Sequence, residues 1–507
     1  MCARSATKGG GTTKGGPRKS HAGGGGRGAA ARLAVAGHRV AVYERTETYG
    51  GALRRRERDG FAFDTGPGLL PLPAVYRDLF VKTGREPLEE CVELVQADPS
   101  SHHVFADGTR VSLPNASRAG VVSAVEEALG ADAARRWGDF LVRAREAWDR
   151  ARRPLLEEPL WPNWEVLAER EPYPAVPHRR LLRLRKAATL AEVGAWELRD
   201  PRLRALLESH ALTFGLDPRT TPASAAVLPY MEHAFGTWYV RGGLRELARA
   251  MYERCLARRV EFHFGAEVTA VREKDGRAAG VELADGTAAE ADLVVAGVGP
   301  GVLERMCGTR LRGEGEVPAR REGASRTTVL LALRGPRPEG TPHRTVVHTR
   351  DREAELDALA GGRLPAEPTV TVLRPDDPAL VPDPGHEAVT VTAVTPAGAD
   401  GVGEYAERMV TAAARTVPDL RDRLLWHEVR TPEDVARETG AEGGAVPAPA
   451  LAAADGRFLH ASNRTRLPGL FTVGGWSHPG GGLPHAGMSG ALVAGLVVEG
   501  PDFRGSQ

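Results

Sequence analysis

The chain has 507 residues, 42% of them hydrophobic, and this length predicts two domains with a sizeable core. A formal net charge of +1 excludes the strong basic excess that nucleic-acid-binding proteins usually carry. The four cysteines (Cys2, Cys91, Cys255, Cys307) are scattered, which predicts neither a disulfide framework nor a metal site. The sequence shows no signal peptide, and no apolar run approaches the roughly 20 residues that a membrane span needs. These features favour a cytoplasmic location.

The N-terminal 1–21 stretch is rich in Gly, Lys and Arg and has no apolar periodicity, so we expect a disordered tail. Good helix formers at 29–36 predict a short helix that ends at Gly37, and the apolar run 39–43 predicts a buried strand. Two short strands are expected within 52–63, around the turn at Asp59-Gly60. The first two elements form the helix–turn–strand half of a βαβ unit.

The glycines at 23–28 precede this helix, as in a dinucleotide-binding motif. Gly23 and Gly26 occupy the second and third glycine positions of G-x-G-x-x-G, and Glu44 is the acid expected on a ribose about 20 residues later. His21 stands at the first glycine position, and no apolar strand can be made from residues 12–20. The alternative is that the cluster is only a flexible linker.

Several blocks of elements follow along the chain. The stretch 74–235 is mostly helical, and 325–396 carries alternating strands such as 327–333 and 388–394. The other predicted elements are helices at 244–256, 404–416 and 488–498, and strands at 260–264, 267–272, 278–283, 291–296 and 470–473.

Three separate blocks of residues carry a family resemblance. The first runs from Glu44-Arg45 through Gly50-Gly51 and Arg54 to Phe63-Asp64-Thr65-Gly66-Pro67. The second comprises 239–244 and 265–268, and the third runs through the glycine-rich loop 470–482 to 487–491. In this order the blocks resemble the FAD-dependent phytoene desaturases and their amine oxidase relatives.

The resemblance implies an α/β (mixed α+β) flavoprotein of the glutathione-reductase-like FAD fold. The FAD-binding domain would be discontinuous, assembled from 22–73, 237–315 and 456–507. A substrate domain of helices and an antiparallel sheet would be inserted as 74–236 and 316–455. The implied cofactor-binding residues are Gly23, Gly26, Glu44, Arg45, Gly50, Gly51, Arg54, Thr65, Gly66, Val268, Gly474, Gly475, Gly487 and Met488.

Two histidines flank the loop that the resemblance puts at the flavin. His478 is the candidate catalytic residue, because a histidine there could move a proton at neutral pH. The alternative for both His478 and His485 is that they pack or hydrogen-bond within the loop. Trp476 is expected to be a wall of the site rather than a participant in the chemistry.

The implied reaction is the dehydrogenation of a lipophilic isoprenoid or carotenoid by hydride transfer to FAD. Three alternatives stay open: an amine oxidase-type reaction, a carotenoid isomerisation without net redox change, and a flavin-free, non-catalytic remnant that lacks the first strand. The basic stretch 178–186 predicts a surface helix that could contact the inner face of a membrane, or else an ordinary solvated helix.

Overall fold

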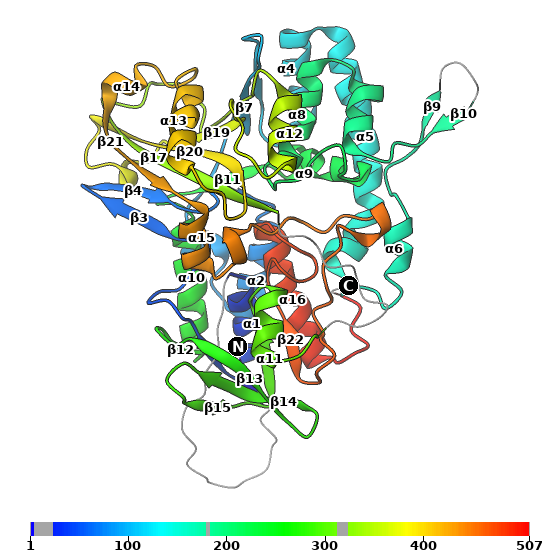
Figure 1. Cartoon of the computed structure of the whole chain (residues 1–507), viewed down its shortest axis with the longest axis vertical. Helices are drawn as coiled ribbons and strands as arrows, with labels where there is room; N and C mark the ends of the chain where they lie inside the picture. The colour runs from blue at the N-terminus through cyan, green and yellow to red at the C-terminus, as the bar shows by residue number, and fades with distance from the viewer. Residues whose placement is uncertain (1, 5–23, 179–182, 312–322, 506–507) are drawn as a thin grey trace.

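The computed structural model describes residues 2–4, 24–178, 183–311 and 323–505. Two regions make up the molecule (Figure 1). The lower region in this view is built around a five-stranded sheet and combines stretches from the beginning, middle and end of the chain. The upper region combines a seven-stranded sheet with a group of helices.

The five-stranded sheet has the strand order β12-β2-β1-β16-β22. Its strands are β12 (Glu261–His263), β2 (Arg39–Tyr43), β1 (Cys2–Arg4), β16 (Leu293–Ala296) and β22 (Leu470–Thr472). β12 runs parallel to β2, β22 runs parallel to β16, and β1 is antiparallel to both of its neighbours. The four parallel strands therefore end at one common edge, where parallel sheets place their ligands.

The central strand β1 corrects the expectation of a disordered tail over 1–21. Residues 2–4 form a strand, with Cys2 opposite Ala41 and Arg4 opposite Arg39, whereas residues 5–21 lie outside the described residues. Because Arg4 pairs with the first residue of β2, β1 ends at the edge opposite to the one where the parallel strands end. A dinucleotide motif needs a parallel strand that turns directly into the helix, and β1 runs in the other direction.

The sheet is buried on both faces. Val40, Val42 and Val295 pack against four helices on one face: α1 (Gly24–Val35), α2 (Ala74–Thr83), α10 (Leu244–Ala257) and α16 (Leu483–Val498). Tyr43 and Val294 point to the other face, which is covered by a three-stranded sheet and a helix: β13 (Val268–Lys274), β14 (Arg277–Leu283), β15 (Ala288–Glu290) and α11 (Pro300–Cys307). Burial on both faces explains why 40–43 and 293–296 are apolar runs rather than alternating strands.

Two helices begin five residues earlier than the sequence predicts. α1 begins at Gly24 instead of residue 29, and α16 begins at Leu483 instead of residue 488. Pro484 is tolerated in the first turn of α16, where its missing N–H has no helical partner to lose. The glycines that sequence reasoning assigned to a loop are therefore helical in both cases, because each helix packs closely on the other.

The upper region contains a seven-stranded sheet of order β21-β17-β20-β19-β18-β7-β8. Its strands are β21 (Leu424–Arg430), β17 (Ala324–Arg334), β20 (His386–Pro396), β19 (Val370–Leu373), β18 (Arg344–Val347), β7 (Ser101–Val104) and β8 (Arg110–Leu113). All pairs are antiparallel except β18 with β7. Around it lie α12 (Arg352–Ala360), α13 (Val402–Ala413), α14 (Leu420–Arg423) and α15 (Pro432–Thr439).

The long strand β17 shows why this sheet is buried on both faces. Leu331 and Leu333 pack in the cluster that contains α13, whereas Leu330 and Ala332 pack with Phe61. Phe61 belongs to the hairpin of β3 (Arg55–Arg58) and β4 (Phe61–Asp64), which comes from the lower region. The hairpin therefore joins the two regions through an apolar contact.

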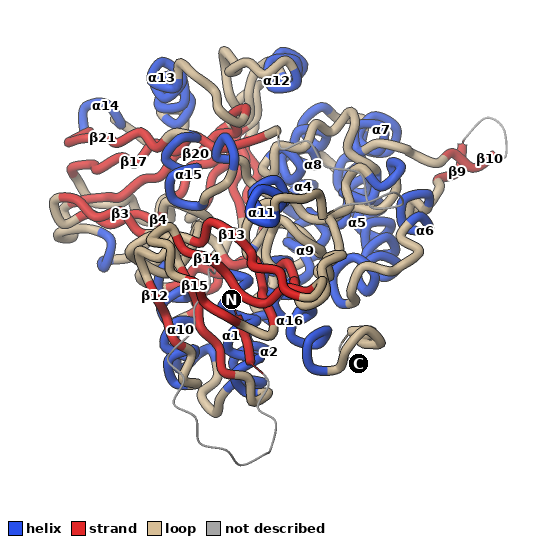
Figure 2. Tube along the Cα trace, turned by 60° about the horizontal axis from the view of Figure 1, so that its bottom comes forward, coloured by secondary structure: helices blue, strands red, loops and turns tan. Residues whose placement is uncertain are grey.

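Helices fill the rest of the upper region, on the right of Figure 2. They are α4 (Arg118–Leu129), α5 (Ala131–Arg152), α6 (Glu165–Glu169), α7 (Leu190–Val193), α8 (Pro201–Leu212) and α9 (Val227–Phe235). The short helix α3 (Leu88–Cys91) instead packs in the core of the lower region. A small sheet of β5 (Leu70–Pro71), β11 (Thr237–Val240) and β6 (Leu94–Gln96) connects the upper helices to the lower region. The prediction that 74–235 is mostly helical is confirmed for the described residues.

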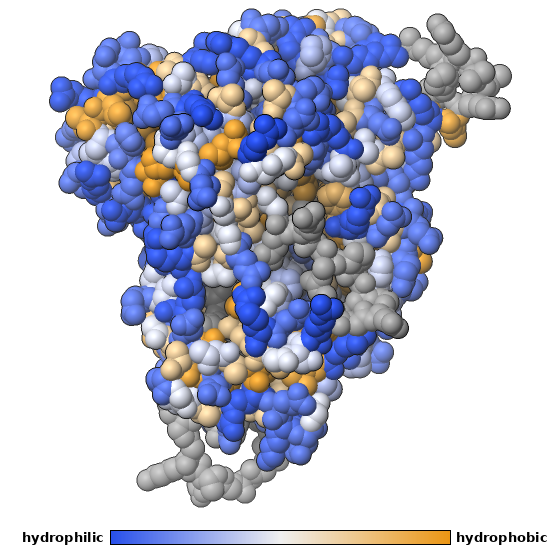
Figure 3. All heavy atoms as spheres, viewed as in Figure 1, coloured by the Kyte–Doolittle hydropathy of each residue, from blue (hydrophilic) through white to orange (hydrophobic). Residues whose placement is uncertain are grey.

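In the basic stretch 178–186, the described residues His178 and Arg183–Arg185 lie in strands and not in a helix, which corrects the prediction there, whereas 179–182 lie outside the described residues. The stretch contributes to a hairpin of β9 (Val176–His178) and β10 (Arg183–Arg185) that projects from the molecule in Figures 1 and 2. None of the helices in the described ranges is long and apolar enough to cross a bilayer. On the face drawn in Figure 3, hydrophobic side chains gather in small patches among hydrophilic ones.

Candidate cofactor site

A glycine-rich loop joins the end of β22 to the start of α16. Gly474 and Gly482 have φ of +99° and +94°, a region that residues with a Cβ adopt only under strain. A Cβ added to Gly475 would lie 2.6 Å from Pro447 Cγ, whereas one added to Gly474 would meet nothing within 4 Å. The loop therefore packs tightly on one side and borders open space at Gly474.

Asn463, which is fully buried, holds this loop in place. Its Nδ2 lies 2.8 Å from the carbonyl oxygen of His478 and 3.0 Å from Ser489 Oγ. The Ser489 hydroxyl in turn accepts the backbone N–H of Gly474 at 3.0 Å. Sequence reasoning missed Asn463, because an isolated asparagine ahead of a strand matches no motif.

His478 is completely buried within this arrangement. Its Nε2 lies 3.0 Å from the carbonyl oxygen of Glu158, and burial lowers its pKa to about 4. The pKa of His485 is also lowered to about 4, first by burial and then by the neighbouring His478. Both rings are neutral at pH 7, and their surroundings favour the packing alternative. A catalytic role for His478 stays a prediction.

The N-terminal half of α1 lies directly against this loop and α16. A Cβ on Gly25 would lie 2.7 Å from the carbonyl oxygen of Ala486 and 2.8 Å from Gly474 Cα, and one on Gly490 would lie 2.6 Å from the Gly25 oxygen. Only glycine permits this approach. Gly26 lies in the first turn of α1, and Gly23 lies outside the described residues.

Arg27, in the same first turn, is the buried group that sequence reasoning missed. Its side chain is 1% exposed, and none of its three guanidinium nitrogens has a hydrogen-bond partner in the part of the chain that the structure describes. Burial lowers its pKa to about 10, so the guanidinium is still charged at pH 7. A buried cation without a partner is unfavourable in water-free surroundings, and this position suits an anionic ligand.

Glu44 and Val268 meet at the same edge of the sheet. Glu44 follows β2, and its Oε1 accepts the N–H and the hydroxyl of Thr46 at 3.0 and 2.9 Å. The backbone N–H of Ala266 donates to the Glu44 carbonyl at 3.0 Å, just ahead of Val268 at the start of β13. The predicted ribose and adenine residues therefore lie side by side, at the edge where β22 leads to Gly474.

The paired glycines Gly50 and Gly51 adopt φ of +123° and +58°. A Cβ on Gly50 would lie 2.5 Å from both Arg245 Nη1 and the Leu53 carbonyl oxygen. Arg245 donates to that carbonyl at 3.1 Å and to the hydroxyl of Thr48 at 2.6 Å. These glycines therefore let a tight loop close around a guanidinium that belongs to α10.

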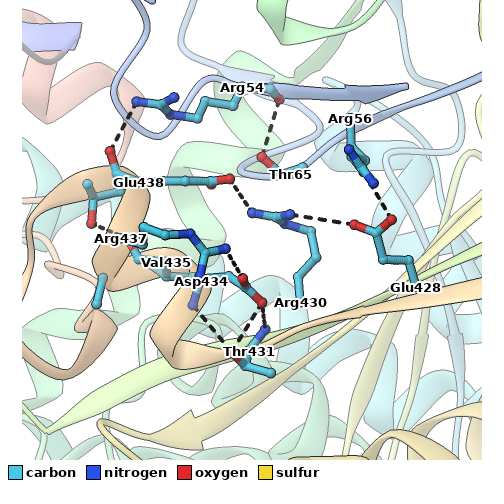
Figure 4. A network of polar contacts seen from close by, with 12 residues as sticks. Arg54, Arg56, Thr65, Glu428, Arg430, Thr431, Asp434, Val435, Arg437 and Glu438 are labelled. Carbon is cyan, nitrogen blue, oxygen red and sulfur yellow. Dashed lines mark hydrogen bonds and ion pairs between the residues drawn. The ribbon is translucent and has the colours of Figure 1, made fainter. Parts of the chain in front are cut away.

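Arg45 and Arg54, which the resemblance assigns to the cofactor, bond to protein carbonyls. Arg54 donates to Gly51 at 2.9 Å and to the Glu438 backbone at 3.1 Å, and Arg45 donates to the backbone at the end of α15. Cations suit this position, because carbonyls at a helix C-terminus carry partial negative charge. Figure 4 shows Arg54 reaching α15 from the neighbouring region.

Around Arg54 lies a network of ion pairs that joins the two regions (Figure 4). Arg56 pairs with Glu428 at 2.9 Å, Glu428 also approaches Arg430 at 3.7 Å, and Arg430 pairs with Glu438. These side chains line a cavity of ≈ 590 Å³ between β3, β21 and α15. Because its cations already have protein partners, the network holds the two regions together.

The remaining predicted residues of the first block have packing roles. Thr65 donates its backbone N–H to Arg54 at 3.0 Å, and a Cβ on Gly66 would collide with the Ala52 carbonyl. Asp64 accepts the N–H groups of Leu244 and Arg245 at 2.7 and 3.3 Å and so caps α10. Burial raises the pKa of Asp64 to about 7.

Gly487 and Met488 lie in the first turns of α16. A Cβ on Gly487 would lie 2.7 Å from Val75 Cγ1, so α2 approaches α16 closely there. The hydroxyl of Tyr76, also on α2, donates to the Leu483 carbonyl at 2.9 Å. Met488 is partly buried against the same apolar core. These contacts fix the direction in which the N-terminus of α16 points.

Trp476 lines a cavity of ≈ 390 Å³ next to the loop. Trp161, Trp164 and Phe503 contribute to the same walls, with Glu158 and Arg464 among the polar members. That Trp476 is a wall of the cofactor site stays a prediction. No group of three or more metal-ligating side chains exists in the described part of the chain.

Comparison with known proteins gives one family match and many relatives. Residues 28–498 match the family described as flavin containing amine oxidoreductase. A 4,4'-diapolycopene oxygenase of Methylomonas sp is 27% identical over 94% of this chain and 97% of its own length. A hydroxyneurosporene desaturase of Rhodobacter capsulatus is 28% identical over 93% and 95%, and a zeta-carotene-forming phytoene desaturase of Myxococcus xanthus is 28% identical over 93% and 92%.

Solved structures share the fold. An oxidoreductase from Methanosarcina mazei superposes with a TM-score of 0.65 at 18% identity, covering 93% of this chain and 98% of its own. A putrescine oxidase bound to putrescine gives a TM-score of 0.59 at 14% identity, covering 95% and 99%. The mixed α/β fold predicted from the sequence is confirmed, and at these identities the likeness extends to the fold alone.

Proposed function

The chain belongs to the flavin containing amine oxidoreductase family, and from this premise we propose that it is an FAD-dependent enzyme that dehydrogenates a carotenoid-type isoprenoid. The observation that carries the proposal is the similarity, over 93–94% of the chain, to proteins named for carotenoid desaturation and oxygenation. The similarity spans both regions, including the one that would select the substrate.

The residues at the edge of the five-stranded sheet fit FAD. The N-terminus of α1 would face the diphosphate, Glu44 the ribose, and the backbone near Val268 the adenine. The loop around Gly474 and the N-terminus of α16 would hold the ribityl chain and the flavin ring. When bound, FAD would accept the hydride equivalents that leave the substrate.

The protein itself would bind, orient and exclude water. The start of α16 would favour negative charge on the ring that it faces, since a helix N-terminus carries unpaired N–H groups. Neutral His478, locked to the Glu158 carbonyl at 3.0 Å, would keep the loop in shape. In this proposal catalysis rests on placing one C–H bond next to the cofactor in dry surroundings, with no group named as a base.

A lipophilic substrate is supported by the relatives named for carotenoids and by the tryptophans that line the cavity at Trp476, beside charged residues such as Glu158 and Arg464. We also propose that the substrate region comprises 74–236 and 316–455, and that the β9–β10 hairpin contacts a membrane surface at the inner face. Leu184 on this hairpin is 73% exposed, and the hairpin projects from the molecule. Sedimentation with anionic vesicles should decrease for Leu184→Asp if the contact exists.

The proposed function can be tested on the purified full chain. The bound flavin is released by heat and identified as FAD or FMN by chromatography. The holoprotein is then mixed without oxygen with phytoene or hydroxyneurosporene in vesicles, and the flavin absorbance band is recorded. Bleaching of the band together with a longer conjugated product supports the proposal.

The alternatives give different results in the same experiment. Bleaching by putrescine but not by a carotenoid would indicate an amine oxidase, and isomerised product without bleaching would indicate an isomerase. A colourless protein that takes up no added FAD would indicate a flavin-free remnant. A product that contains oxygen would indicate the reaction for which the Methylomonas relative is named.

A further inference from the structure

Arg27 is a buried cation that has no hydrogen-bond partner among the described residues. The unpaired atoms are its Nε, Nη1 and Nη2, and the guanidinium lies 5.9 Å from the ring of Tyr49. Five N–H donors are therefore held away from water without an acceptor. Native structures rarely leave such groups unpaired, so each one requires a physical explanation.

The titratable groups near Arg27 add to the excess positive charge. Arg245 is a second cation, and Glu44 is the one carboxylate that acts on Arg27 from the described residues. Cys255 and Tyr76 are the other neighbours, and burial raises the pKa of both groups, so they are neutral at pH 7. Arg27 therefore has one carboxylate near it, whose Oε1 already accepts two hydrogen bonds from Thr46, and a second guanidinium that repels it.

The helix that carries Arg27 strengthens this imbalance. α1 has 12 residues, and its first turn contains no acidic side chain. The first N–H groups of a helix have no partner within it and carry partial positive charge. The buried guanidinium therefore sits on the first turn of a helix that itself offers unpaired N–H donors, and Gly25 of the same turn lies against Gly474.

We propose that Arg27 is a diphosphate-binding residue that donates to the diphosphate of the dinucleotide cofactor from the first turn of α1. This inference rests on the proposed function and goes beyond it, because it assigns one residue of this chain to one group of the ligand. A guanidinium matches two phosphate oxygens at once through parallel N–H bonds.

The direction of β1 is a physical reason for a phosphate-binding side chain at the start of α1. A diphosphate is usually held by backbone N–H groups in the tight turn between a parallel strand and the helix. Here the central strand β1 is antiparallel to β2 and ends at the opposite edge of the sheet, so its own end does not lie at the start of α1. Arg27 adds side-chain donors at the start of α1, and these reinforce the unpaired backbone N–H groups there.

The test uses the full-length apoprotein, prepared by removing flavin, in three variants: Arg27→Leu, Arg27→Lys and Arg32→Leu. Arg32 lies on the same helix but pairs with the exposed Asp78 at 2.6 Å, so its removal is the matched control. Binding of ADP, adenosine and FAD is measured by calorimetry and flavin fluorescence. The melting temperature of each apoprotein is recorded.

Two changes of opposite sign are expected for Arg27→Leu. The affinity for ADP and FAD should fall on the order of 10- to 100-fold, whereas the affinity for adenosine stays unchanged. The apoprotein should melt about 1–3 °C higher, because an uncompensated buried charge has been replaced by an apolar side chain. Arg27→Lys should lose less affinity, and Arg32→Leu should bind ADP as the wild type does.

Distinct results would overturn the proposal. Equal ADP affinity in wild type and Arg27→Leu would show that Arg27 does not contact the diphosphate, with the proposed function untouched. A lower melting temperature of the Arg27→Leu apoprotein, or an equal loss of adenosine binding, would show that Arg27 has a protein partner. Failure of the wild type to bind either ADP or FAD would refute the proposed function itself and this inference with it.

Discussion

Two glycine-rich segments, one at each end of the chain, lead into α1 and α16, and they satisfy their polar groups in different ways. Around 474–482, Asn463 and Ser489 supply partners to the backbone from within the protein. Around 24–28, the guanidinium of Arg27 has no partner among the described residues. The C-terminal segment has its partners within the described protein, whereas we propose that a ligand completes the N-terminal one.

The comparison separates residues that stabilise the fold from residues that would bind the ligand. The C-terminal side is held by hydrogen bonds that exist without ligand, so its variants should change stability first. The N-terminal side carries uncompensated positive charge, so its variants should change affinity first. Arg27→Leu tests this division directly, and four further variants test it at other residues.

The largest expected effect is on the pH dependence of stability, through His478. Its pKa is lowered from 6.5 to about 4, so the unfolded chain binds more protons than the folded one between these values. The stability that neutral His478 contributes is present above pH 6.5 and is lost as pH falls towards 4, by about 3 kcal/mol. Arg27, with a pKa of about 10, stays charged throughout this range and contributes nothing to the loss.

Urea unfolding at several pH values between 7 and 4 measures this loss for wild type and for His478→Gln. The variant should lose less stability over the range, because one buried ring that resists protonation is gone. Equally steep losses in both proteins would show that the acid sensitivity of the cleft does not arise at His478.

Asn463→Ala should destabilise the protein by about 2–3 kcal/mol, because it leaves the His478 carbonyl and Ser489 Oγ buried without their partner. Thermal unfolding of the apoprotein measures the change. Ser462→Ala is the control: this hydroxyl accepts only the N–H of Arg464 among the described contacts of its Oγ, so the change should stay within about 0.5 kcal/mol. Equal effects of the two variants would contradict the role of Asn463.

Gly490→Ala should cost about 1–2 kcal/mol, because the added Cβ would lie 2.6 Å from the Gly25 oxygen and force α1 away from α16. Flavin content should fall together with stability, since this contact brings the two segments together. Gly403→Ala in α13 is the matched helical control, because a Cβ there would meet nothing within 4 Å. Unchanged flavin content in Gly490→Ala would show that the cleft tolerates a wider separation of the helices.

Glu44→Gln should have the smallest effect, a loss of adenosine and FAD affinity of about tenfold, or about 1.4 kcal/mol. Gln keeps an oxygen for Thr46, so the melting temperature should barely change. Glu47→Gln, three residues further on, is the control and should bind adenosine normally. Unaltered affinity in Glu44→Gln would remove this residue from the proposed ribose contact.

Much of this molecule could be predicted from local patterns. The apolar runs at β2 and β16, the hairpin of β13 and β14, and the amphipathic helix α10 lie where periodicity and turn residues indicated them. The prediction of a helix over 178–186 is wrong for the described residues of this stretch. Its charge pattern suits a helix or a strand, and the pairing of β9 with β10 makes those residues strands. Helix starts at Gly24 and Leu483 were missed because glycine and proline normally argue against a helix.

The sequence by itself determined the family, the order of the elements and the glycines that must stay glycine, since these depend on residue type and on near neighbours. Only the tertiary structure decided that Arg45 and Arg54 bond to the end of α15, that Asn463 and Ser489 hold the flavin-type loop, and that Arg27 is buried without a partner. These contacts involve groups that lie tens to hundreds of residues apart in the chain. Whether a charged side chain has a partner depends on the atoms that surround it in the folded protein.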